Sequence, residues 1–245
     1  MRIFWIAMMA LLTAGPAMAC GQGGQCEVDG RSYAAKLPPD WDGRSALPVL
    51  LHFHGWGRQG KNVVNNQRVA GATDAAGALL LAPDGLGKSW AFWSDDRRDV
   101  TFAEAVLADA AQRWPIDRER IVISGFSYGS AMAWFLACDE GGAYRAILGV
   151  AGMLRGIGRR DCATGPLRIR NVHGRKDTVM GLHGGEDAMT FWAARSDCGA
   201  AQVAKAGQYH RITREGCDVQ LDLHPGGHWI PKGWLREQLI AVLAP

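Results

Sequence analysis

The strongest constraint on the fold is a series of short, continuous apolar runs that recur along the chain. They occupy residues 48–53, 79–82, 121–124, 146–150 and 167–172, with a last strand expected over 219–223. A strand without alternation of apolar and polar residues is buried on both faces, as the strands of parallel sheets are. Apolar residues at helical spacing lie between the runs and predict helices over 101–113, 128–138, 186–195 and 232–243. The sequence therefore predicts an α/β fold, with a mostly parallel central sheet covered by helices on both faces.

Composition limits the class of protein further. The chain has 245 residues, of which 48% are apolar, and its 27 Lys and Arg against 24 Asp and Glu give a net charge of +3. These values are typical of a globular protein, and charges of mixed sign give no phosphate-binding surface, so no nucleic-acid partner is expected. Near the start of the domain, Asp29-Gly30 between two short apolar stretches predicts a hairpin over 26–35.

The N-terminus has the organisation of a signal peptide. Arg2 is followed by an apolar run over 3–13, then by Gly15-Pro16 and the small-residue site Ala17-Met18-Ala19. We expect residues 1–19 to be a signal peptide and 20–245 a single domain of an exported protein, periplasmic or extracellular. Cleavage there leaves Cys20 first, but a lipid anchor is the less favoured alternative because no Leu precedes the small residues. No later segment is apolar enough to span a membrane.

Export makes the six cysteines informative. An even number of cysteines in an oxidising compartment predicts disulfides. Proximity in the sequence favours the pairs Cys20–Cys26, Cys138–Cys162 and Cys198–Cys217. The alternative is that some are free buried thiols, above all Cys138 at the end of an apolar helix. No C-x-x-C pair is present, which argues against a zinc ribbon or a redox site.

The motif that carries chemistry is Gly125-Phe126-Ser127-Tyr128-Gly129, between an apolar strand and a helix. A G-x-S-x-G sequence in this context is the nucleophile turn of the α/β-hydrolase fold, in which the glycines avoid contact with neighbouring backbone. The alternative is a glycine-rich turn that only packs. The motif predicts Ser127 as the nucleophile and an α/β-hydrolase fold.

A serine nucleophile needs a base, which in this fold is a histidine near the end of the chain. The last histidines are His224 and His228, in the sequence His-Pro-Gly-Gly-His-Trp after the last strand. His228 lies on the glycine-rich loop and is the predicted base. His224 is the competitor, but its place at the end of the strand indicates a structural role.

The acid is expected after the strand over 167–172, and Asp177 is the candidate there. It would accept the Nδ1 proton of His228, fix the tautomer and stabilise the imidazolium. Asp222 and Asp187 are the alternatives; the first lies inside a strand and the second opens a helix.

Acyl transfer also needs donors for the oxyanion. We expect the backbone N–H groups of Tyr128, directly after the nucleophile, and of Trp56, in the loop after the strand over 48–53. His52 and His54 on the same strand offer a metal site as a minor alternative, because no third ligand follows at suitable spacing. No metal and no cofactor are expected.

From Pro48 onward the chain resembles the polyhydroxybutyrate-depolymerase-like esterases, exported α/β-hydrolases that include feruloyl and acetylxylan esterases. The resemblance is carried by His54-Gly55, 82–85 with Trp90, 99–100 leading to 114–117, the serine motif, 172–174 with Asp177, Phe191-Trp192 with Cys198, and 226–231. It implies that His228 is catalytic and that Cys198 pairs with a cysteine before the final strand. Tyr128 departs from the Asn or small residue of many relatives and is expected to narrow or line the acyl pocket.

Four tryptophans are candidates for substrate binding: Trp56, Trp90, Trp93 and Trp229. They would stack on an aromatic acyl group, a sugar or a polyester; the alternative is that they cover the core.

The residues and the resemblance together predict an exported serine esterase that acts through an acyl-enzyme. Its expected partner is an ester substrate, single or polymeric, of the polyhydroxybutyrate or hydroxyalkanoate type. Feruloyl or acetylxylan esters of plant polysaccharide are the first alternative. A serine peptidase and a non-catalytic binding protein on the same fold are the further ones.

Overall fold

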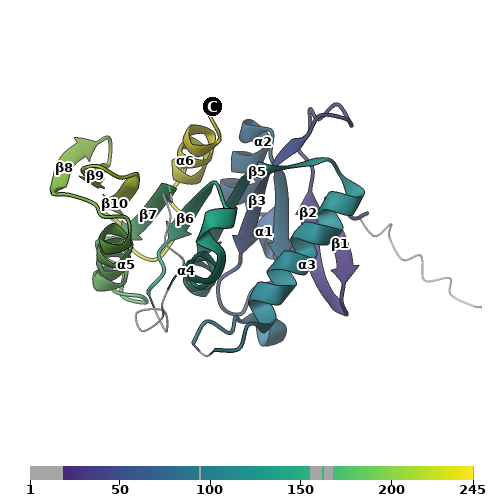
Figure 1. Ribbon diagram of the computed structural model, residues 1–245, viewed down its shortest axis with the longest axis horizontal. Coiled ribbons are helices and arrows are strands. Elements are labelled where there is room, and N and C mark those ends of the chain that lie inside the picture. Colours follow the sequence, from purple (N-terminus) through teal and green to yellow (C-terminus); the bar gives the residue numbers. More distant parts are fainter. Residues whose placement is uncertain (1–18, 94, 155–161, 163–167, 245) are drawn as a thin grey trace, which may run out of the picture.

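One ten-stranded sheet runs through the part of the chain that the computed structural model describes, residues 19–93, 95–154, 162 and 168–244 (Figure 1). The expected signal peptide lies outside these residues, except for Ala19. The strands are β1 Gln22–Val28, β2 Arg31–Lys36, β3 Leu47–Phe53, β4 Leu79–Pro83, β5 Ile116–Phe126, β6 Ala146–Val150, β7 Arg168–Gly174, β8 Ala201–Ala206, β9 Tyr209–Arg214 and β10 Val219–His224.

The middle of the sheet is parallel and both edges are antiparallel. The strand order is β1-β2-β4-β3-β5-β6-β7-β10-β9-β8. The six strands from β4 to β10 in this order pair in parallel, whereas the hairpins β1–β2 and β8–β9 add antiparallel strands at the two edges. Parallel strands all end at one side of the sheet, and the loops that follow them meet there. The predicted mostly parallel sheet is confirmed.

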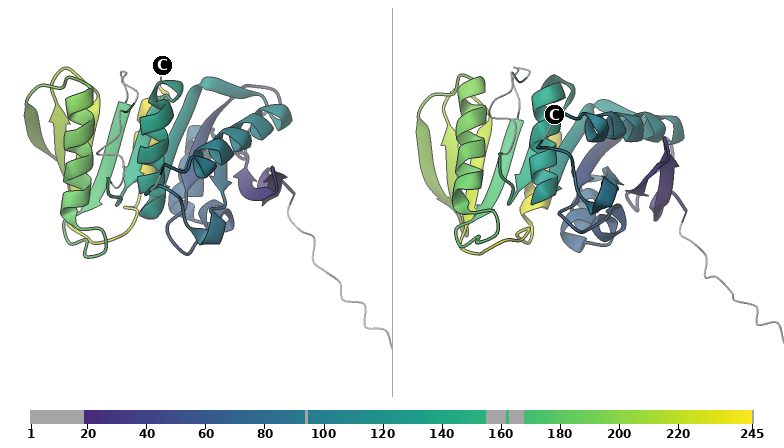
Figure 2. Two further views of the ribbon diagram at one scale, coloured as in Figure 1. Left: turned by 60° about the horizontal axis from the view of Figure 1, so that its bottom comes forward. Right: turned by 90° about the horizontal axis from the view of Figure 1, so that it is seen from below.

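Helices cover both faces of the sheet, as predicted (Figures 1 and 2). On β3, Val49 and Leu51 belong to the core shared with α3, α4 and α5, whereas Leu50 belongs to the core shared with α1, α2 and α6. This explains why the strand is apolar at every position. The helices are α1 Gly60–Val64, α2 Gln67–Ala76, α3 Arg98–Arg113, α4 Tyr128–Glu140, α5 Leu182–Arg195 and α6 Trp234–Leu243, with the short 3₁₀ turns η1 Leu86–Lys88 and η2 Gly141–Ala143.

Two regions differ from the sequence-based expectation. Residues 199–216, for which no strand was predicted, form the antiparallel hairpin of β8 and β9. The side chains of β8 are exposed at five of its six positions, so no apolar alternation marks it as a strand. The helices α1 and α2 were not predicted either.

The structure pairs the six cysteines as Cys20–Cys26, Cys138–Cys162 and Cys198–Cys217. These are the pairs that proximity in the sequence favours, and none of the six is left as a free thiol.

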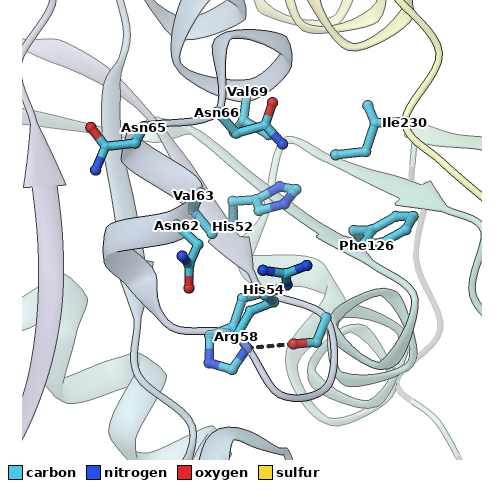
Figure 3. Close-up of a pocket in the computed structure, with 11 residues that line it drawn as sticks. His52, His54, Arg58, Asn62, Val63, Asn65, Asn66, Val69, Phe126 and Ile230 are labelled. Carbon is cyan, nitrogen blue, oxygen red and sulfur yellow. Dashed lines mark hydrogen bonds between the residues drawn. The ribbon is translucent and has the colours of Figure 1, made fainter.

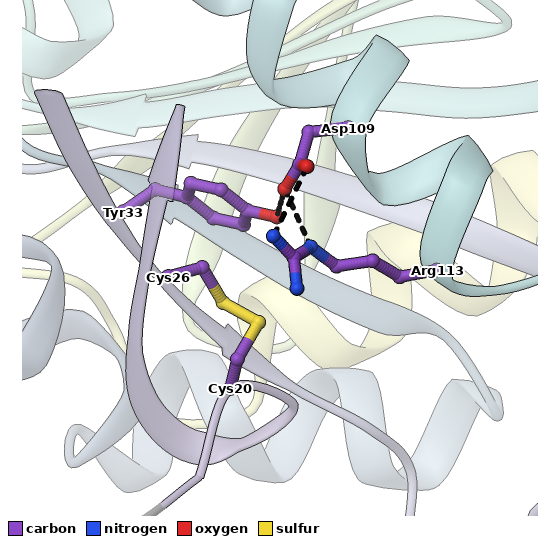
Figure 4. Close-up of a disulfide and its surroundings, with 5 residues drawn as sticks. All are labelled: Cys20, Cys26, Tyr33, Asp109 and Arg113. Carbon is purple, nitrogen blue, oxygen red and sulfur yellow. Dashed lines mark hydrogen bonds and ion pairs between the residues drawn. A yellow bond between two sulfur atoms is a disulfide. The ribbon is translucent and has the colours of Figure 1, made fainter. Parts of the chain in front are cut away.

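The first disulfide lies in a hairpin that is held to α3 (Figure 4). Beside it, Tyr33 Oη on β2 donates a hydrogen bond of 2.5 Å to Asp109 Oδ2 on α3. Arg113 donates to both oxygens of the same carboxylate, at 2.6 and 3.1 Å. The two strands at this edge are thus fastened to α3, which packs on β1 and β4.

None of the helices in the described ranges has the length and apolarity that crossing a bilayer requires.

Candidate active site

Ser127 occupies the tight turn between β5 and α4. Its φ of 56° is in the left-handed region, and its N–H donates a hydrogen bond of 2.9 Å to the carbonyl oxygen of Val150 on β6. A Cβ at Gly125 would lie 2.1 Å from the carbonyl oxygen of Gly129, and one at Gly129 would lie 2.0 Å from that of Phe53. Only glycine fits at both positions, which explains the G-x-S-x-G spacing. The turn holds the serine at the carboxyl end of the parallel strands.

Asp177 and His228 meet across two neighbouring parallel strands. Asp177 follows β7 and His228 follows β10, and the last residues of these strands lie opposite one another in the register. His228 Nδ1 is 2.7 Å from Asp177 Oδ2. The other carboxylate oxygen accepts hydrogen bonds from the backbone N–H groups of Val179 and Met180, at 2.8 and 3.0 Å. The carboxylate is therefore fixed in position with one oxygen toward the imidazole.

Burial and hydrogen bonding act in opposite directions on the pKa of Asp177. Burial alone raises the pKa of this carboxyl, but the hydrogen bonds from His228 and from two backbone N–H groups outweigh burial and hold the pKa below its usual value. Asp177 is therefore ionised at neutral pH, as a partner for an imidazolium must be.

The ring of His228 lies beside the serine turn. Its centroid is 4.8 Å from that of Phe126, the residue directly before Ser127. The structure thus brings the predicted base and acid into contact and places the base beside the residue that precedes the predicted nucleophile.

His173 is a neighbour of this group that the sequence analysis did not single out. It is buried on β7, and its Nε2 lies 3.3 Å from Asp177 Oδ2 without the alignment of a hydrogen bond. Burial lowers the pKa of His173 to about 4, more than the charge of Asp177 raises it. Asp177 therefore lies beside a second imidazole, which is neutral, in addition to that of His228. In the sequence, the feature that could have pointed to this residue is the pair His173-Gly174 just before Asp177.

The competing residues are engaged elsewhere. His224 is buried, and its Nδ1 accepts a hydrogen bond from a backbone N–H of its own loop. Asp222 binds Arg211 through both carboxylate oxygens, at 2.8 and 3.0 Å. Asp187 is exposed on α5. In the described part of the chain, neither aspartate contacts His228.

The two expected oxyanion donors lie next to the serine turn. Tyr128 begins α4, and the loop with Trp56 runs so close to the turn that a Cβ at Gly55 would be 3.2 Å from the ring of Phe126. Among the described residues, neither the N–H of Trp56 nor that of Tyr128 has a hydrogen-bond acceptor. Both are free to donate to a substrate oxygen.

Of the four tryptophans, Trp90 is not available to a substrate. Its side chain is fully buried, and its Nε1 donates a hydrogen bond of 2.8 Å to the carbonyl oxygen of His54. The expectation that it binds substrate is wrong, because this loop folds inward and Trp90 supports the chain before the oxyanion loop. Trp56, Trp93 and Trp229 are 70%, 55% and 46% exposed.

The three exposed tryptophans have different surroundings. Trp93 belongs to an aromatic cluster with Phe92 and Tyr128, with ring centroids 4.9 Å apart for Trp93–Phe92, 5.2 Å for Phe92–Tyr128 and 6.5 Å for Trp93–Tyr128. Trp229 instead lies over Gly226 of its own loop, where a Cβ would be 1.8 Å from the indole. Only Trp93 is joined to the residue directly after Ser127.

A cavity of about 400 Å³ opens beside Phe126 (Figure 3). Its polar lining was not predicted, because loop amides have no diagnostic spacing. The lining residues are His52, His54, Gly55, Arg58, Asn62, Val63, Asn65, Asn66, Val69, Phe126 and Ile230.

Both histidines of the minor metal hypothesis line this cavity. His54 has Nδ1 2.9 Å from the carbonyl oxygen of Gly55, and its Nε2 accepts a hydrogen bond from Gly85, so both nitrogens are used. His52 Nδ1 is 3.2 Å from Ser124 Oγ, and burial lowers the pKa of His52 to about 3. Within the described residues, no group of three or more His, Cys, Asp or Glu side chains could hold a metal ion.

Comparisons with known proteins find esterases. Residues 97–216 match the family model described as Phospholipase/Carboxylesterase. The chain is 26% identical over 213 residues to "Probable feruloyl esterase C" of Aspergillus niger, covering 82% of this chain and 77% of that protein. It is 25% identical over 254 residues to "Feruloyl esterase D" of Neurospora crassa, covering 91% and 85%.

Solved structures agree on the fold. The acetyl xylan esterase from Aspergillus awamori superposes with a TM-score of 0.73 at 13% identity, covering 86% of this chain and 94% of that one. The curated relatives are named feruloyl esterases, and the acetyl xylan esterase supports the fold alone. The protein is a carboxylic ester hydrolase with the α/β-hydrolase fold, similar to the feruloyl and acetylxylan esterases.

Proposed function

We propose that the protein hydrolyses esters of aromatic carboxylic acids of the feruloyl type, with Ser127 as nucleophile, His228 as base and Asp177 as acid. The observation that carries the choice of acyl group is the aromatic cluster of Phe92, Trp93 and Tyr128, which begins at the residue after Ser127. An aromatic ring packs favourably against other rings in offset or edge-to-face contact. The feruloyl esterase names of the relatives support the same acyl group.

The reaction has two halves. His228 takes the proton of Ser127 Oγ as this oxygen attacks the ester carbonyl, and the N–H groups of Trp56 and Tyr128 donate to the resulting oxyanion. The imidazolium then gives the proton to the departing alcohol, which leaves an acyl group on Ser127. Water attacks the acyl-enzyme with His228 again as base, and this step releases the acid and restores the serine.

The hydrogen bond to Asp177 orients His228 throughout. Because Asp177 Oδ2 accepts from Nδ1, the other ring nitrogen is left without a proton and can act as the base. The charge that develops on the ring is stabilised by a carboxylate already ionised at neutral pH.

The proposal includes export to the periplasm or the exterior. Three disulfides are typical of proteins that reside in an oxidising compartment, and they support the signal peptide expected over residues 1–19. The ester is a small molecule or part of a polymer that can reach Trp93 and Tyr128.

A substrate panel tests the choice of acyl group. The expected result is that methyl ferulate is hydrolysed with a higher kcat/KM than methyl acetate, and that Trp93→Ala lowers this ratio by raising KM for methyl ferulate. Ile240→Ala removes an exposed apolar side chain on α6 and is the matched control. A ratio near one in the unmodified protein, or a ratio unaffected by Trp93→Ala, would contradict an aromatic acyl site. Labelling by a fluorophosphonate reports the activated serine separately.

A further inference from the structure

The two residues that flank Ser127 belong to different surroundings. Tyr128 contacts the aromatic cluster, whereas Phe126 lines the polar cavity of Figure 3. The cavity also includes Gly55 of the oxyanion loop and Ile230, two residues after His228. Ser127 and His228 do not line the cavity themselves, but Phe126, whose ring lies 4.8 Å from that of His228, does. A substrate bound at Ser127 can therefore extend past Phe126 into the cavity.

The charged and polar side chains that line the cavity are cationic or neutral, and none is an acid. Arg58 supplies a cation, and Asn62 and Asn66 supply side-chain N–H groups that can donate hydrogen bonds. Asn65 Nδ2 already donates a hydrogen bond of 2.7 Å to the carbonyl oxygen of Lys61. No Asp or Glu is among the lining residues, and Arg58 has no ion pair among the described residues. Figure 3 shows Arg58 among the lining side chains.

The other titratable residues that line the cavity are His52 and His54, which carry no negative charge. His52 is neutral because burial lowers its pKa to about 3, and burial also lowers the pKa of His54. Asp84 after β4 is not among the lining residues, and its carboxylate accepts hydrogen bonds from Ser32 Oγ and the N–H of Gly60, at 2.8 and 2.5 Å. A guanidinium surrounded by neutral donors favours an anion with planar geometry.

We propose that this cavity is a carboxylate-binding subsite, by which the enzyme selects esters that carry a second, free carboxylate. Arg58 binds the carboxylate in a fork, and the asparagine amides add hydrogen bonds. The volume of about 400 Å³ fits a short chain or one sugar ring between that carboxylate and the ester. The proposal rests on ester hydrolysis at Ser127 but not on the nature of the acyl group.

Two pairs of substrates test it and separate the side of the ester that carries the charge. On the acyl side, monomethyl adipate is compared with its terminal carboxamide by release of methanol. On the alcohol side, 3-acetoxybutyrate is compared with its carboxamide by release of acetate. In at least one pair the carboxylate is expected to have a kcat/KM about tenfold higher than the amide, mainly through KM, as a charge-assisted hydrogen bond predicts.

Variants assign the preference to the cavity. Arg58→Gln is expected to bring the carboxylate-to-amide ratio close to one, and Arg58→Lys to retain part of it. Arg44→Gln, an exposed arginine in the loop before β3 at the opposite end of the strands, is the matched control and should keep the ratio. Equal rates in both pairs, or a preference that survives in Arg58→Gln, would overturn the proposal.

A binding measurement keeps the subsite separate from catalysis. Calorimetric titration of the Ser127→Ala protein should show that monomethyl adipate binds more tightly than its carboxamide. Arg58→Gln in the same background should remove this difference in affinity. Equal binding of both compounds would count against the subsite. Absence of fluorophosphonate labelling in the unmodified protein would instead count against Ser127 as nucleophile.

Discussion

Ser127 has a backbone conformation that residues other than glycine rarely adopt, and the contacts of the neighbouring residues hold it in that conformation. Its N–H is bound to β6, and the glycines two positions before and after it leave no room for a Cβ. Strain at a single residue persists only where its surroundings enforce it. The serine is thereby presented at a fixed position before any substrate arrives.

Ser127→Ala is expected to abolish ester hydrolysis and leave the free energy of unfolding nearly unchanged, because only the nucleophilic oxygen is removed. His228→Ala should reduce kcat almost as far, and the double variant should be no worse than Ser127→Ala, since the residues act as a unit. Steady-state rates with 4-nitrophenyl acetate measure this. Substantial activity in Ser127→Ala would refute the assignment.

Gly129→Ala is expected to prevent correct folding or to lower stability by several kcal/mol, because its Cβ would lie 2.0 Å from a carbonyl oxygen of β3. Gly142→Ala is the matched control, since no atom lies within 4 Å of a Cβ there. Urea unfolding of both variants gives the comparison. Similar stability for the two would show that α4 can move away from the sheet.

The residue scale also shows where sequence reasoning succeeds and fails. The tight turn at Ser127 could be predicted because Gly125 and Gly129 lie so close to neighbouring backbone that only glycine fits there. The catalytic roles of Ser127 and His228 stay predictions. Trp90 was assigned to the substrate surface because of its loop, although its indole is buried against His54. The direction of a side chain on a loop depends on tertiary contacts that the sequence does not display. The same holds for Arg58 in the cavity.

Among the elements, the hairpin of β8 and β9 has the weakest local support. β8 is an edge strand with exposed side chains, so few apolar contacts hold it. It is attached at both ends by one disulfide: Cys198 follows α5, and Cys217 precedes β10. These polar strands were not predicted, because an alternation of apolar and polar residues marks a strand only where one of its faces is buried.

Replacing Cys198 and Cys217 together by serine is expected to lower the free energy of unfolding by roughly 3 kcal/mol, because the bridge closes a loop of about 20 residues in the unfolded chain. Activity should fall at temperatures where the variant is still folded, since β10 delivers the loop of His228. Thermal unfolding and residual rates measure both effects. Non-reducing peptide mapping checks the pairing itself, and free alkylated cysteines in exported protein would refute it.

Over the whole molecule, buried neutral histidines make stability depend on pH. The pKa of His173 is about 4 and that of His52 about 3 in the folded protein, against about 6.5 for a histidine in the unfolded chain. Between these values the unfolded chain binds protons that the folded protein does not. The free energy of unfolding therefore falls as the pH drops below about 6.5.

The expected loss from His173 alone is on the order of 3 kcal/mol between pH 6.5 and 4. Urea unfolding at several pH values measures the slope, and His173→Gln should reduce it. His210→Gln, at an exposed position on β9, is the matched control. A slope that is the same in both variants would contradict a neutral His173 in the folded protein.

At this scale the sequence predicted the parallel sheet and its two helical layers, because strands buried on both faces leave continuous apolar runs. It did not predict α1 and α2, which frame the cavity beside Phe126. The cavity is formed by segments distant in sequence, and its shape follows from how they pack together.

The attachment of the two outer segments has a practical consequence. Near the start of the domain, the carbonyl oxygen of Gly21 accepts a hydrogen bond from the N–H of Leu37, just after β2, and the last residue of β2 lies opposite Leu80 near the start of β4. Near the other end, the carbonyl oxygen of Ala244 accepts a hydrogen bond from Arg145, just before β6. Both contacts lie where parallel strands begin, whereas Ser127 lies where they end. An affinity tag, a fused module or a solid support joined at either position would therefore leave the side of the sheet that carries Ser127 open to solvent. Immobilised enzyme should therefore keep its full turnover.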